Sequence, residues 1–107
     1  MSRFAETVER LAATIESRRG GDPAKSWSAR LLSDRQLAAK KLAEEALEAS
    51  LAFVLKDDDA LAAESADLIY HWLVVLAAAG VSLDDVATKL EAREGTSGVA
   101  EKAARKP

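Results

Sequence analysis

Two acidic pairs on neighbouring segments place the strongest constraint on how this chain can fold. In each pair the acids lie three residues apart, so on a helix they occupy neighbouring turns of one face. A polar stretch, KDDDA at 56–60, separates the two segments. Two helices joined by a short turn run antiparallel, so we expect the two pairs to face each other. The pairs are Glu45 with Glu48 and Glu64 with Asp67.

Carboxylates gathered in this way cannot all stay ionised without compensation. They bind cations, pair with Lys or Arg, or take up protons. The chain has no Cys and one His, which excludes a typical zinc site. Mg²⁺ prefers carboxylate and water oxygens, and it keeps open positions that suit phosphate oxygens. The acidic pairs therefore indicate Mg²⁺ and a phosphorylated substrate.

A purely structural interpretation of the acids stays open at this point. They can be solvent-facing helix charges with i,i+4 partners, such as Lys41 with Glu45. Against this, helical spacing places the acids on the same face as Leu51 and Leu55. A solvated run of charges would lie opposite the leucines.

The composition favours an all-α fold. Ala and Leu dominate, and 49% of the 107 residues are hydrophobic. We expect one domain over residues 1–94, a four- to five-helix bundle, and a mobile or weakly helical tail over 95–107. The segment 66–79 is apolar almost all round, so a short chain like this needs more cover for it. We expect a homodimer to supply that cover.

Charge and hydropathy exclude several partners. The net charge of −3 gives no basic footprint for nucleic acid. The N-terminal residues contain no apolar signal core. The longest apolar run, Leu68–Ala79, is too short to span a bilayer. We therefore expect a soluble, cytoplasmic protein with no nucleic-acid or membrane partner.

Capping residues predict where the helices begin and end. Ser2 can cap a first helix that ends before Gly20 and Gly21. Segment 16–33 carries Pro and Gly and is expected to be a loop. Ser33 with Gln36 predicts the start of a second helix that runs to about Leu55. Asp57–Asp59 can cap a third helix over about 60–79, which Gly80 ends. Ser82 with Asp85 predicts the start of a last helix that runs to about Arg93.

The expected loop is dense in residue types that bind phosphate. Arg18, Lys25 and Ser26 are of these types, and Trp27 lies among them. A large aromatic residue in a polar loop usually packs on something. A solvated linker is the structural alternative for this segment.

The order of the acids also resembles a known pattern. EExxE followed by ExxD is the signature of the all-α nucleoside triphosphate pyrophosphohydrolases, the MazG-like superfamily, and here it reads Glu44-Glu45-x-x-Glu48 and Glu64-x-x-Asp67. Within that superfamily the chain is similar to the phosphoribosyl-ATP pyrophosphohydrolase family of histidine biosynthesis. The similarity covers most of the chain, including PAKSWSARLL, KKLAEEALEA and ESADLIYHWLVVL. Trp27 is a departure, because the family usually has Tyr there.

The resemblance implies an activity and roles for particular residues. The activity is the Mg²⁺-dependent hydrolysis of the α–β phosphoanhydride of phosphoribosyl-ATP to phosphoribosyl-AMP and pyrophosphate. Glu45, Glu48, Glu64 and Asp67 would bind Mg²⁺. The catalytic residues would be Glu44, Glu48 and Lys41. Glu44 would orient water, and a carboxylate not fully used by the metal would accept the water's proton. Substrate contacts are expected from Arg18, Lys25, Ser26, Trp27, Lys41 and Arg93.

Two other functions remain alternatives. One is a MazG-like house-cleaning pyrophosphatase that acts on other nucleoside triphosphates. The other is a helical dimerisation module without catalysis. A di-iron carboxylate bundle fits less well, because it needs Glu-x-x-His pairs and the single His71 lies four residues after Asp67. We expect His71 to be buried and hydrogen-bonded rather than to act as the base.

Overall fold

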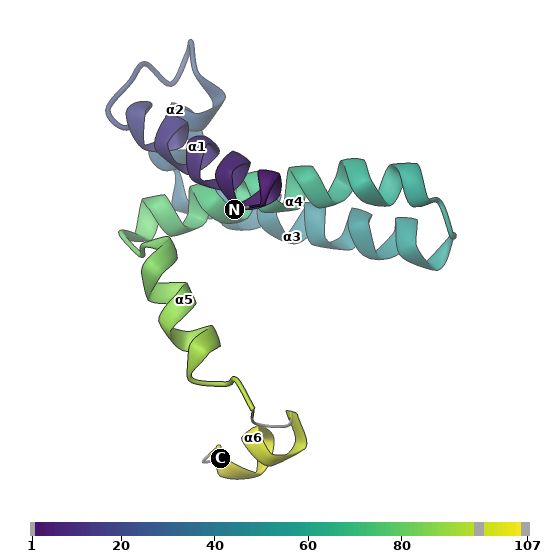
Figure 1. Cartoon of the computed structure of the whole chain (residues 1–107). Helices are drawn as coiled ribbons and strands as arrows, with labels where there is room; N and C mark the ends of the chain where they lie inside the picture. The colour runs from purple at the N-terminus through teal and green to yellow at the C-terminus, as the bar shows by residue number, and fades with distance from the viewer. Residues whose placement is uncertain (1, 96–97, 106–107) are drawn as a thin grey trace.

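The computed structural model describes residues 2–95 and 98–105, and all regular elements in these ranges are helices (Figure 1). This confirms the all-α class. The six helices are α1 Arg3–Ser17, α2 Trp27–Leu32, α3 Arg35–Val54, α4 Asp58–Ala79, α5 Leu83–Glu91 and α6 Gly98–Ala104.

Helices α3 and α4 form the long antiparallel hairpin that the acidic pairs predict (Figure 1). The turn between them is made by local hydrogen bonds. Lys56 adopts a positive φ of 57°, and the Asp57 N–H donates to the Ala52 carbonyl at 3.0 Å, which closes the end of α3. The Asp57 side chain then accepts from Ala60 N at 3.0 Å and caps α4. In this turn α3 therefore ends and α4 begins at residues with specific capping roles.

The core lies where α1 and α2 cover one end of the α3–α4 hairpin. Ile15 of α1, Leu31 of α2 and Val74 of α4 are almost fully buried there. Ala38 of α3 lets the helices approach closely, because its side chain is small and buried. Arg19, which follows α1, adds a hydrogen bond to α4, because its guanidinium donates to the Ala77 carbonyl near the C-terminal end of that helix.

Replacing a fully buried core residue tests this packing. We expect Leu31→Ala to lower the free energy of unfolding by about 2–5 kcal/mol, because Leu31 is 0% exposed and its removal leaves a cavity. The control Leu90→Ala removes the same atoms from a residue that is 61% exposed, and should change stability by less than about 0.5 kcal/mol. Urea unfolding measures both. Equal effects of the two substitutions would contradict the assignment of the core.

Most capping predictions agree with the structure, and two details differ. Ser2, Asp57 and Ser82 are N-caps, and Ser82 forms its capping box with Asp85. Segment 16–33 was expected to be a loop throughout, but residues 27–32 form α2. The expected Ser33 cap is also wrong: Asp34 accepts from Leu37 N at 3.1 Å and caps α3 instead.

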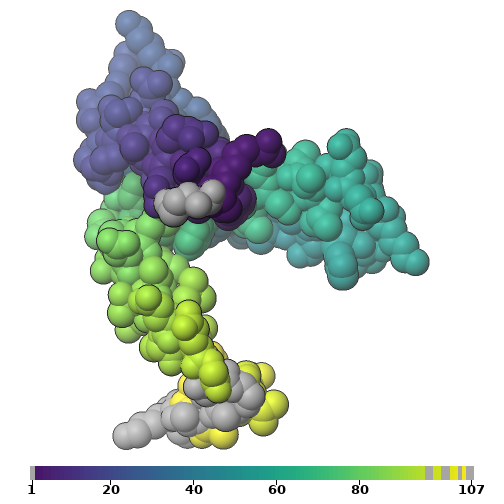
Figure 2. Space-filling view, viewed as in Figure 1, coloured from purple at the N-terminus to yellow at the C-terminus, as the bar shows by residue number. Residues whose placement is uncertain are grey.

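Large apolar side chains remain exposed along the outer half of the hairpin, which projects away from the rest of the molecule (Figure 2). They are Leu47, Leu51, Phe53, Val54 and Leu55. Exposed apolar surface of this kind is typical of an interaction site. It agrees with the expectation of a homodimer, which stays a prediction.

Helix α4 is longer than its apolar run suggests. It has 22 residues and, by length and composition, is the one helix in the described ranges that could cross a membrane. Core helices of soluble proteins pass the same test, and α4 is the helix against which α1, α2 and α3 all pack. We therefore assign the part of α4 that carries the buried His71, Leu73 and Val74 to the protein core.

The C-terminal part of the chain leaves the bundle. Helix α5 points away from the hairpin, and α6 lies beyond it (Figure 1). Part of the expected tail, 96–97 and 106–107, lies outside the described residues.

Candidate metal and substrate site

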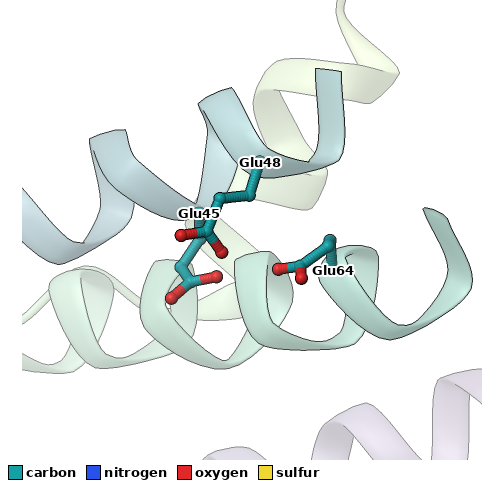
Figure 3. A group of neighbouring side chains, drawn as sticks. All are labelled: Glu45, Glu48 and Glu64. Carbon is teal, nitrogen blue, oxygen red and sulfur yellow. The ribbon is translucent and has the colours of Figure 1, made fainter. Parts of the chain in front are cut away.

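Three carboxylates converge between α3 and α4. Glu45 and Glu48 extend from α3 towards Glu64 of α4 (Figure 3). One carboxylate oxygen from each residue lies within 4.8 Å of the others. The helical spacing of the first pair puts both side chains on the face of α3 that packs against α4.

The three acids differ in their exposure to solvent. Glu45 is only 8% exposed, Glu64 is half-buried and Glu48 is exposed. Within the described residues, the Oε2 atoms of Glu45 and Glu64 are buried and have no hydrogen-bond partner. A buried carboxylate oxygen without a partner is costly, so it marks a place where a cation or a proton belongs.

Their mutual repulsion appears in the pKa values. A side-chain hydrogen bond with Glu48 and desolvation raise the pKa of Glu64 to about 7. Burial, followed by the charge of Glu48, raises the pKa of Glu45. Without a metal ion, this cluster therefore holds protons at a pH where isolated carboxylates have lost them.

Glu44 has a different environment, although it lies next to Glu45 in the sequence. Its carboxylate accepts a hydrogen bond from Lys41 Nζ at 2.9 Å, and Lys40 Nζ lies 4.0 Å away. This hydrogen bond lowers the pKa of Glu44 and raises the pKa of Lys41. The i,i+4 pair of Lys41 with Glu45 proposed from the sequence is therefore replaced by an i,i+3 pair with Glu44.

Asp67 lies near the three acids but is not one of the converging set. Its side chain is exposed, and its charge is among the causes that raise the pKa of Glu45 and of Glu64. Its backbone carbonyl accepts from Nδ1 of His71 at 2.8 Å. His71 is 7% exposed, so it is buried and hydrogen-bonded as expected from the sequence.

The other residues expected to contact substrate lie at helix ends and in the loop before α2. Arg18 is the C-cap of α1, Lys25 is exposed in the loop, and Arg93 follows α5. The basic side chains that lower the pKa of an acid of the first motif are instead Lys41 and Lys40, which act on Glu44. The structure thus brings Lys41 to the cluster, and it leaves the basic loop residues on other elements.

Two further residues of the expected substrate set begin α2. The Ser26 side chain accepts from Ala29 N at 3.1 Å and caps the helix. Trp27 is 43% exposed, and the Arg30 guanidinium lies 5.8 Å from its ring centroid. Trp27 therefore presents an aromatic face beside a cation instead of being buried in the core.

A contact between α2 and α4 was not foreseen. The Ser28 and Tyr70 hydroxyls lie 2.5 Å apart, although the residues are 42 positions apart in the chain. The Tyr70 ring then meets the His71 ring edge to face, with centroids 4.9 Å apart and planes at 88°. No spacing rule signals such a contact, because it depends on how α2 folds back onto α4.

The donor set fits Mg²⁺. Mg²⁺ binds oxygens at about 2.0–2.1 Å, so the oxygens around one ion lie up to about 4.2 Å apart. The converging oxygens lie within 4.8 Å of one another, which is close to that spacing. Two of the three acids offer a buried oxygen without a partner. The three candidate ligands are carboxylates and the chain has no Cys, which favours a hard cation over a thiophilic one.

Comparison with known proteins identifies the family of this chain. Residues 8–94 match the family model described as phosphoribosyl-ATP pyrophosphohydrolase. A protein of Caulobacter vibrioides named phosphoribosyl-ATP pyrophosphatase is 66% identical over 103 residues, which cover 96% of each chain. Its namesake in a Caulobacter species is 67% identical over 105 residues, 98% of each chain. One from Cereibacter sphaeroides is 54% identical over 99 residues, 92% of this chain and 96% of that one.

The match begins within α1, spans all of α2 to α5, and contains every acid of the cluster. The chain belongs to the phosphoribosyl-ATP pyrophosphohydrolase family.

Proposed function

We propose that this protein hydrolyses the α–β phosphoanhydride of phosphoribosyl-ATP to phosphoribosyl-AMP and pyrophosphate, the second step of histidine biosynthesis. The observation that carries the proposal is the convergence of Glu45, Glu48 and Glu64 in a chain of this family. Clustered carboxylates with buried unpaired oxygens favour a metal-dependent reaction on a phosphorylated substrate.

We assign Mg²⁺ to the three converging carboxylates, with Asp67 as the fourth ligand. When bound, Mg²⁺ would neutralise polyphosphate charge and polarise the phosphorus under attack. The protein's own part is to hold acids close enough that their repulsion is relieved only by a cation or by protons. Glu48 is the exposed member of the cluster, so we assign to it acceptance of the proton from the attacking water.

Lys41 and Glu44 form a second functional pair in this proposal. Glu44 fixes the Lys41 ammonium beside the cluster, where the ammonium can contact a phosphate oxygen. In this arrangement Glu44 orients Lys41 and the water near it. Further substrate contacts are assigned to Arg18, Lys25, Ser26, Trp27 and Arg93.

Removing the Lys41 charge tests this assignment. We expect Lys41→Met to lower kcat/KM for phosphoribosyl-ATP by about 10–100-fold, since a hydrogen bond to a charged group contributes roughly 1.5–3 kcal/mol. The matched control is Lys40→Met, because Lys40 is exposed and lies 4.0 Å from Glu44. Steady-state kinetics should show the control within about threefold of wild type. A control as impaired as Lys41→Met would remove the specific role of Lys41.

We also propose that the enzyme is a soluble, cytoplasmic homodimer whose catalytic domain is residues 1–94. The exposed leucines of the hairpin support the dimer, because a second copy would cover them. The end of the family match at residue 94 supports the domain boundary.

The activity is tested by incubating the protein with phosphoribosyl-ATP and Mg²⁺ and following the products by ³¹P NMR. We expect pyrophosphate and phosphoribosyl-AMP in equal amounts, and no turnover after chelation of the metal. ATP, dATP, UTP and dUTP, assayed at equal concentration, test the house-cleaning alternative. Faster hydrolysis of any of these nucleotides than of phosphoribosyl-ATP would reject the proposed substrate, and no hydrolysis of any compound would favour the dimerisation module.

A further inference from the structure

The three converging carboxylates cannot by themselves distinguish phosphoribosyl-ATP from ATP. Phosphoribosyl-ATP is ATP that carries a second phosphoribosyl group on its adenine ring, so both compounds present the same triphosphate to Glu45, Glu48 and Glu64. A metal ion held by these acids binds phosphate oxygens, which the two compounds share. A preference for one compound therefore requires protein groups at the other end of the nucleotide, beside the purine.

The ring of Trp27 is open to a ligand of this kind. Helix α2 buries Ala29 and Leu31 in the core and leaves Trp27 43% exposed. The Arg30 guanidinium lies over the indole ring, 5.8 Å from its centroid. Aromatic rings and guanidinium planes are the surfaces on which proteins commonly stack nucleobases. The pair therefore offers a stacking surface for a purine, with a positive charge beside it.

The segment that leads into α2 holds Trp27 in place. The Ser26 side chain accepts from Ala29 N at 3.1 Å and caps the helix directly before Trp27. Gly21 packs closely against this turn, because a Cβ at Gly21 would lie 3.5 Å from the Ala29 Cβ and 3.0 Å from the Arg18 carbonyl oxygen. A surface that is already ordered loses little conformational entropy when a ligand binds to it.

Trp27 also lies beside the helix that carries part of the acidic site. The residue after it, Ser28, contacts Tyr70 of α4, with the two hydroxyls 2.5 Å apart. Tyr70 lies three residues after Asp67, on the neighbouring turn of the same face of α4. The charge of Asp67 acts on two of the converging acids. A nucleotide whose phosphates lie at the acids can therefore extend along α4 towards α2.

We propose that Trp27 and Arg30 bind the base end of the substrate: the indole stacks on the purine, and the guanidinium binds the phosphate of the second phosphoribosyl group. That group is attached to the purine ring, so its phosphate lies near the surface on which the ring stacks. Arg suits this role, because its planar guanidinium donates two parallel hydrogen bonds to a phosphate. This proposal deepens the proposed function and rests on it. Trp27 then recognises the adenine of both compounds, and Arg30 distinguishes them.

Three compounds without a phosphoanhydride test the role of Trp27. Ribose 5-phosphate has no base, AMP adds the adenine, and phosphoribosyl-AMP adds the second phosphoribosyl group. Calorimetric titration of the wild type should show affinity that rises in this order, by about tenfold or more at each addition. Trp27→Leu should weaken the binding of AMP and of phosphoribosyl-AMP about tenfold, and leave ribose 5-phosphate within about threefold. Trp27→Tyr keeps an aromatic ring and should stay within about threefold for all three compounds.

The same titrations test Arg30 separately. Arg30→Gln should weaken phosphoribosyl-AMP about tenfold and leave AMP within about threefold, because only the former carries the second phosphate. The matched control is Arg35→Gln, which removes the same charge from an exposed arginine at the start of α3. The control should leave all three affinities within about threefold of wild type. A folding defect would weaken all three compounds alike, so it is distinguished from the loss of one contact.

Several results would overturn the proposal. They are a wild type that binds AMP no better than ribose 5-phosphate, a Trp27→Leu protein that binds AMP normally, and an Arg30→Gln protein that loses AMP and phosphoribosyl-AMP equally. Failure of the proposed function gives a different result. A wild type that shows the expected binding but does not hydrolyse phosphoribosyl-ATP would reject the activity alone. Normal hydrolysis with unaffected binding by the variants would reject the base-binding roles alone.

Discussion

Glu48→Gln should abolish hydrolysis of phosphoribosyl-ATP while making the metal-free protein more stable. The substitution keeps the size of the side chain and removes one negative charge from three converging carboxylates. Loss of a ligand and proton acceptor should lower kcat by on the order of 10³-fold or more, at or above the cost of removing one preorganised electrostatic contact in other enzymes. Loss of a like charge should raise the Tm of the metal-free protein, because Glu48 raises the pKa of Glu64 through a hydrogen bond and also through its charge.

The opposite signs of these two effects distinguish a metal site from a structural cluster. The control Glu9→Gln makes the same chemical change on an exposed position of α1 and should alter neither activity nor Tm. Steady-state kinetics and thermal unfolding in chelator measure the pair. A Glu48→Gln protein that keeps its activity, or that melts below wild type without metal, would contradict the assignment.

The stability of the metal-free protein should fall as pH rises from about 4.5 to about 7. The pKa of Glu64 is about 7 in the folded chain against 4.5 for an ordinary glutamate, so the folded state binds more protons than the unfolded state in this interval. Stability must then decrease with rising pH across the interval and become independent of this group above about 7. The raised pKa of Glu45 acts in the same direction.

The acids whose pKa values are lowered do not change the stability of the protein in this pH interval. The pKa values of Glu16, Glu44 and Asp85 are lowered by their partners, so their stabilising effects are lost only as pH falls below the ordinary range of a carboxyl group. Thermal unfolding between pH 4.5 and 8, with chelator or with Mg²⁺, measures the effect. Saturating Mg²⁺ should flatten the decline, because the metal replaces the protons. A metal-free Tm that is constant or rises between pH 5 and 7 would refute the clustered-carboxylate account.

Those parts of the fold that depend on neighbouring residues were predictable from the sequence. Ser2 and Asp57 cap helices as expected, because an N-cap side chain bonds only to the first turn that follows it. Gly80 ends α4 with a φ of 73°, which few residues other than glycine adopt readily. That acids of α3 and α4 face each other was predictable as well, because a short turn between two helices makes them run antiparallel.

Features that depend on packing between distant residues were not predictable. Helix α2 has only six residues, too few for a periodic pattern, and it is held by burial of Ala29 and Leu31. Whether Lys41 pairs with Glu44 or Glu45 depends on which acid α4 covers, and the buried one is Glu45. The Ser28–Tyr70 contact likewise requires the complete arrangement of α2 and α4.

The most direct test of the account is a crystal structure of the protein soaked with Mn²⁺, which substitutes for Mg²⁺ and gives an anomalous signal. We expect an anomalous peak between α3 and α4, with oxygens of Glu45, Glu48 and Glu64 at about 2.0–2.2 Å from the ion. A peak bound elsewhere, or three carboxylates that remain protonated and hydrogen-bonded to one another at saturating Mn²⁺, would contradict it.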